Sequence, residues 1–106
     1  FKNLESLTLR HCNFVGLMMK NKSLFKNLNN LIRLELTCIK IQLIDNNLFT
    51  GLEKLEELSL NQCEIDNIQV NSFKNLINLK KLALNQNKLT NIELETFSDL
   101  NKLVFF

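Results

Sequence analysis

The sequence predicts an α/β solenoid, a right-handed parallel β superhelix with short strands on the concave face and a mostly irregular convex side. Two observations predict it. A phenylalanine recurs every 24 residues, and each is followed three residues later by a leucine. Between these marks, leucines stand two residues apart, which places both on one face of an extended segment. The recurring positions are Phe25, Phe49, Phe73 and Phe97 with Leu28, Leu52, Leu76 and Leu100.

The repeats organise residues 1–106 as one domain of four coils, with partial coils at both ends. The third and fourth coils match the pattern L-x-x-L-x-L-x-x-N/C-x-L at every position. The second coil carries Ile39 where asparagine or cysteine belongs, and the first takes 27 residues, its additional residues falling between Met18 and Ser23. The four coils are 4–30, 31–54, 55–78 and 79–102.

Each coil is expected to contribute one strand. In the third coil, Leu58 and Leu60 point inward while Glu57 and Ser59 point outward. Because every coil runs in the same direction, neighbouring strands pair in parallel, and the return segments make the solenoid right-handed. These segments are too short for a long helix, so turns, extended pieces or single helical turns are expected. The phenylalanines should stack as an internal spine, beside Ile44, Ile68 and Ile92.

An asparagine is expected to close the turn after each strand by bonding backbone groups of adjacent coils. Asn87 fits this role in the fourth coil. Cys12 and Cys63 stand at the equivalent position and offer a weaker sulfhydryl donor, while Ile39 offers none. The ladder should therefore be interrupted at the second coil, at a cost of about 1 kcal/mol for each lost bond.

The three cysteines are predicted to be free thiols. Cys12 and Cys63 lie two coils apart, about 10 Å by strand spacing, whereas a disulfide needs alpha carbons within about 7 Å. Both should be buried. Cys38 falls one position earlier in its coil and points differently, so it is the one thiol considered for reactivity or an intermolecular bond. The alternative, a half-buried free cysteine, is the more common case.

On these residues the chain resembles the leucine-rich repeat family, and the 24-residue length resembles the extracellular class found in Toll-like receptors and related surface or secreted proteins. The resemblance implies binding of a ligand or co-receptor. The family usually seals its solenoid with cysteine-rich caps, and this chain has neither. We therefore expect an excised central segment whose uncapped ends, at Leu4 to Leu9 and at Leu103 to Phe106, favour self-association.

The outward residues of the strands form the predicted recognition surface, since a solenoid's curved face can vary without touching the core. The alternative is a merely soluble sheet face. Twelve residues make up this concave face: Ser6, Thr8, Arg10, Arg33, Glu35, Thr37, Glu57, Ser59, Asn61, Lys81, Ala83 and Asn85.

Charges on this face have two readings. Arg33, Glu57 and Lys81 alternate in sign across adjacent strands, which favours cross-strand ion pairs of about 0.2 to 1 kcal/mol each. Arg10, His11 and Arg33 have Glu35 as their one acidic neighbour, and an anionic ligand could use them. Solvated basic groups are the more common case, so the ligand reading is the weaker one.

Composition narrows the function classes. The net charge of +2 and the lack of any block of like charges indicate neither nucleic acid nor an anionic membrane surface as partner, and no apolar run could span a bilayer. His11 is the one histidine, and Gly16 and Gly51 stand alone, so neither a metal cluster nor a phosphate-cradling loop is indicated. The prediction is a non-enzymatic module without cofactor or metal that binds a protein or other macromolecule.

Asn21, Lys22 and Ser23 form the one ordinary N-glycosylation sequon, which falls in the lengthened first coil where a glycan could stand clear of the core. The hypothesis is a segment of an extracellular or cell-surface receptor ectodomain in innate immunity or cell adhesion, glycosylated at Asn21. The alternative is a structural or scaffold protein of the matrix or the cytoplasm that mediates protein–protein interaction.

Overall fold

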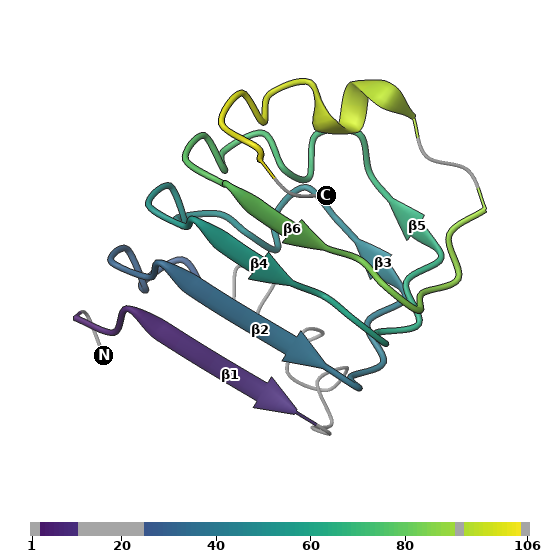
Figure 1. The fold of residues 1–106 in the computed structure, drawn as a ribbon, viewed down its shortest axis with the longest axis horizontal. Coiled ribbons are helices and arrows are strands. Elements are labelled where there is room, and N and C mark those ends of the chain that lie inside the picture. The colour runs from purple at the N-terminus through teal and green to yellow at the C-terminus, as the bar shows by residue number, and fades with distance from the viewer. Residues whose placement is uncertain (1–2, 11–24, 91–92, 105–106) are drawn as a thin grey trace.

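The computed structural model describes residues 3–10, 25–90 and 93–104. It confirms the solenoid (Figure 1). The strands of the concave face form one parallel sheet in the order β1-β2-β4-β6, and two shorter strands pair on the other side of the core. The strands are β1 (Ser6–Arg10), β2 (Arg33–Thr37), β3 (Leu43–Ile44), β4 (Glu57–Ser59), β5 (Asn67–Ile68) and β6 (Lys81–Ala83), followed by the 3₁₀ helix η1 (Leu94–Phe97).

The strand register follows the sequence repeat. Ser6 lies beside Arg33, Arg33 beside Glu57, and Glu57 beside Lys81. The longer first coil therefore does not shift the pairing of β1 with β2. On the convex side, β3 pairs with β5 in the same 24-residue register, Ile44 beside Ile68. The expected extended pieces and single helical turn are present there as β3, β5 and η1.

The core lies between the two sheets and is built from the inward leucines together with the phenylalanine spine. The rings of Phe49 and Phe73 stack with centroids 6.0 Å apart, and those of Phe73 and Phe97 stack at 5.8 Å. Phe25 is also buried at the first coil. Ile44 is buried and Ile68 is half-buried in this core, while Ile92 lies outside the described residues. The predicted spine is confirmed from Phe49 to Phe97.

A close approach between coils explains one glycine. Gly51 has a φ of +92°, which side-chain-bearing residues rarely adopt. A Cβ placed there would lie 2.5 Å from the carbonyl oxygen of Lys26 in the coil before. The turn after Phe49 therefore brings the two backbones together only because this position carries no side chain.

The asparagine ladder is confirmed at Asn87, whose amide ties the fourth coil to the third. Its Nδ2 donates to the carbonyl of Leu60 at 2.7 Å and to that of Leu84 at 3.1 Å. Its Oδ1 accepts from the backbone N–H groups of Cys63 at 2.9 Å and Ile65 at 3.0 Å. Both of those N–H groups belong to fully buried residues, so the amide provides partners for backbone groups that water does not reach.

Cys63 takes the place of the asparagine one coil earlier. Its thiol donates to the carbonyl of Leu36 at 3.1 Å, as Asn87 donates to Leu60. Burial raises the pKa of the Cys63 thiol, against a smaller lowering by the backbone N–H of Ile39. Cys63 is thus free and buried as predicted, and the buried Ile39 side chain has no polar atom to continue the ladder. Cys12 lies outside the described residues.

Candidate recognition face

The sheet β1-β2-β4-β6 presents its outward side chains to two adjoining hollows, which between them include all twelve residues predicted for the concave face. The first hollow, of about 400 Å³, runs across all four strands. The second, of about 620 Å³, lies toward the carboxyl ends of the strands. Glu35, Ser59 and Asn85 line both. The buried leucine core lies behind the outward side chains. It fixes the strands, so outward side chains on neighbouring strands are one strand spacing apart.

Two ion pairs cross neighbouring strands on this face. Arg33 Nε donates to Glu57 Oε2 at 3.0 Å, which confirms that part of the predicted alternation of charge; Lys81 lies beside Glu57 in the register. Arg10 donates through Nε and Nη2 to Glu35 Oε2, at 3.1 and 2.8 Å. All four side chains remain more than a third exposed, so each pair contributes only about 0.2–1 kcal/mol.

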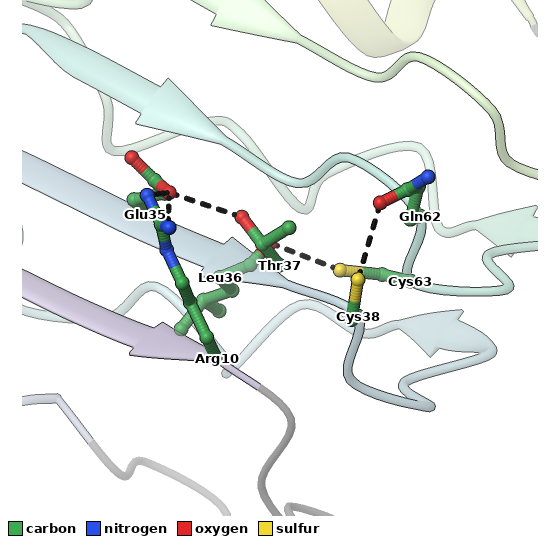
Figure 2. A network of polar contacts seen from close by, with 7 residues as sticks. All are labelled: Arg10, Glu35, Leu36, Thr37, Cys38, Gln62 and Cys63. Carbon is green, nitrogen blue, oxygen red and sulfur yellow. Dashed lines mark hydrogen bonds and ion pairs between the residues drawn. The ribbon is translucent and has the colours of Figure 1, made fainter.

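Figure 2 shows that the Arg10 pair belongs to a larger network, because the hydroxyl of Thr37 also donates to Glu35 Oε2, at 3.2 Å. Glu35 lies directly beside Thr8 in the register, so the contact with Arg10 is diagonal. Arg10 and Arg33, two of the three residues considered for an anionic ligand, each pair with a carboxylate, so part of their positive charge is balanced within the chain. His11 itself lies outside the described residues.

Side-chain amides form a second set of contacts at the carboxyl end of the strands. Asn61 Oδ1 accepts from the backbone N–H of Asn85 at 2.8 Å. One position further along each coil, the thiol of Cys38 donates to Gln62 Oε1 at 3.1 Å, and Gln62 Nε2 donates to Gln86 Oε1. Cys38 is free and half-buried, as predicted.

Cys38, Gln62 and Gln86 share a left-handed backbone, with φ of 58°, 57° and 58°. This conformation is uncommon for residues other than glycine, and the three side chains are joined to one another by hydrogen bonds. The sequence interpretation missed Gln62 and Gln86. The signal that could have found them is their 24-residue spacing, one position after the last outward residue of each strand.

The face therefore supplies paired charges, hydroxyls and amides on a regular sheet, which are groups suited to holding another molecule by hydrogen bonds. Within residues 3–10, 25–90 and 93–104, no three histidine, cysteine, aspartate or glutamate side chains gather in a way that could hold a metal ion. In the same part of the chain, no helix has the length and apolar character needed to cross a membrane.

The fold and repeat define the class of protein. The family model described as leucine rich repeat matches residues 2–65 and 53–106, which together span nearly the whole chain. The chain belongs to the leucine-rich repeat family. Family and fold are typical of modules that recognise proteins or other ligands rather than of enzymes.

Among solved structures, the chain is similar to the crystal structure of a TLR13–ssRNA13 complex, in which the protein is a Toll-like receptor. The TM-score is 0.80 and the sequence identity 30%; the likeness covers 94% of this chain and 14% of that one. The chain thus spans a small part of that receptor's length. No curated protein matches the sequence.

Proposed function

We propose that this chain is a segment of a receptor ectodomain in innate immunity or cell adhesion, and that its concave face binds a protein or other macromolecular ligand. The observation that carries the proposal is the pair of adjoining hollows over four adjacent strands of one sheet, lined by all twelve outward residues. None of these twelve residues belongs to the buried core. The likeness to a Toll-like receptor segment supports the receptor context, and in that context the sequon at Asn21 is a candidate site for a glycan.

One observation favours a second candidate, an intracellular scaffold that mediates protein–protein interaction. Cys38 and Cys63 are free thiols, and Cys63 uses its proton to bond the carbonyl of Leu36. Free thiols persist in a reducing compartment more readily than outside the cell. The two candidates share the concave face and differ in compartment.

The compartment is tested by mass spectrometry of the protein isolated from its own cells. A glycan on Asn21 is the result expected for the receptor. A protein from the cytoplasm with Asn21 unmodified contradicts it and favours the scaffold.

The use of the concave face is tested in the same cells with a photo-reactive amino acid. It is installed at Ser59, which lines both hollows, or at Asn67, an exposed residue of β5 across the core. Adducts should form from position 59 and not from position 67. Adducts from position 67 alone, or equally from both, would contradict recognition by the concave face.

A further inference from the structure

One part of the concave face is free of formal charge. On the third and fourth coils, four side-chain amides line the hollow at the carboxyl ends of β4 and β6, and we call them the amide patch: Asn61, Gln62, Asn85 and Gln86. Ser59 lines the same part of the hollow. The charged side chains of this hollow, Arg10 and Glu35, lie on β1 and β2 and are paired with each other.

Among the described residues, three of the four side-chain oxygens of the patch accept hydrogen bonds, whereas only one of its four amide NH₂ groups, that of Gln62, donates one. The orientation of Asn61 is determined because its Oδ1 accepts from the backbone N–H of Asn85, which can only donate. Gln62 Oε1 accepts from the Cys38 thiol, and Gln86 Oε1 accepts from Gln62. In the described part of the chain, no oxygen accepts a hydrogen bond from Asn61 Nδ2 or Gln86 Nε2. The patch therefore offers hydrogen-bond donors to a ligand.

This chemistry selects an uncharged ligand that is rich in acceptors. A phosphodiester at the patch would lose water without meeting a formal positive charge, which is unfavourable. The described residues that line the two hollows include no aromatic ring, so a base finds no stacking surface. The carbonyl oxygens of a polypeptide main chain are neutral acceptors that need a partner when water is removed.

We propose that the amide patch binds the main chain of a polypeptide ligand, with ligand carbonyl oxygens accepting hydrogen bonds from Asn61 Nδ2 and Gln86 Nε2. This inference rests on the proposed function of the concave face and specifies its ligand as protein rather than nucleic acid. The remainder of the face, with its two ion pairs, then contacts the side chains of that ligand.

Two isosteric variants remove the donors while retaining the contacts inside the chain. In Asn61→Asp, one oxygen still accepts from the N–H of Asn85, and in Gln86→Glu, one oxygen still accepts from Gln62. The matched control is Gln69→Glu after β5, because Gln69 Oε1 likewise accepts from a backbone N–H, that of Asn46 at 3.0 Å. All three variants add one negative charge, so only position distinguishes them.

The probes are peptides selected on the protein from a random library displayed on phage, then synthesised and measured by calorimetry. Asn61→Asp and Gln86→Glu should each weaken binding about tenfold or more, as loss of a hydrogen bond to the ligand implies, while Gln69→Glu stays within about twofold. Replacing single peptide bonds of the ligand by esters, which are poorer acceptors, should locate two sensitive carbonyls. Thermal melting checks that the variants fold.

Other outcomes separate this inference from the proposed function. If Ser59→Trp blocks the peptides and both amide variants bind them normally, the amide patch is excluded and concave recognition stands. If selection yields no peptide that Ser59→Trp blocks, both fail. Tighter binding of a mixed-sequence single-stranded RNA that displaces the peptides would overturn the assignment of the ligand as protein.

Discussion

Replacing Asn87 by alanine should destabilise the solenoid strongly, because one amide satisfies several backbone groups in two coils. The change removes the acceptor for the N–H groups of Cys63 and Ile65, both in residues with no exposed surface, and the donor to the carbonyl of Leu60. At about 1–3 kcal/mol for each of the two buried N–H groups left without a partner, the loss is about 2–6 kcal/mol. A domain of this size has about 5–15 kcal/mol of stability in total.

The assay is urea denaturation followed by circular dichroism, with two comparison variants. Asn85→Ala removes an exposed amide on the concave face and should change the unfolding free energy by less than about 0.5 kcal/mol. Asn87→Cys copies the arrangement at Cys63, whose thiol bonds Leu36, and should recover about 1 kcal/mol relative to alanine. The reasoning is refuted if Asn87→Ala costs no more than Asn85→Ala, or if cysteine recovers nothing.

Four further predictions follow from the core and the turns. Gly51→Ala should lower stability by about 1–3 kcal/mol in a thermal melt, because its φ is +92° and a Cβ would meet the Lys26 carbonyl; an unchanged melting temperature would contradict this. Phe73→Ala should cost about 3–5 kcal/mol in urea denaturation, because Phe73 is buried and stacks on rings on both sides, and a loss below about 1 kcal/mol would argue against the spine. Since burial raises the pKa of Cys63 above its usual 9.0, the folded chain holds that proton more tightly than the unfolded chain, so the contribution of this thiol to stability should be constant below pH 9 and fall as pH rises above it. Cys63→Ala should flatten that fall, and the Cys38 thiol, which is half-buried, should react with a thiol reagent before that of Cys63; equal rates would contradict the burial.

Most of the fold could be predicted because each structural role recurs at a fixed position in the repeat. The alternation of Leu58 and Leu60 with outward residues determines the strand and its face, and the 24-residue spacing aligns neighbouring strands. The phenylalanine spacing likewise predicts the spine. Short β3 and β5 were less predictable, since two-residue strands carry no alternation to detect and form only where one turn lies beside the next.

The face was predictable as a set of residues but not as a set of contacts. The pairing of Arg33 with Glu57 follows from their equivalent positions in adjacent coils. Arg10 instead reaches diagonally to Glu35, a choice that depends on the length of the arginine side chain and on the hydroxyl of Thr37. Gln62 was missed because its role depends on a left-handed backbone that a glutamine does not signal in sequence.

Recognition by the concave face is tested most directly by the affinity of the protein for the ligand that cross-linking from Ser59 identifies. Ser59→Trp places an indole ring where the two hollows meet, and Asn67→Trp places the same ring at the exposed residue of β5 across the core. The first variant should weaken binding about tenfold or more and the second should leave it within about twofold. Equal affinities for the two variants, or a loss confined to Asn67→Trp, would contradict recognition through this face.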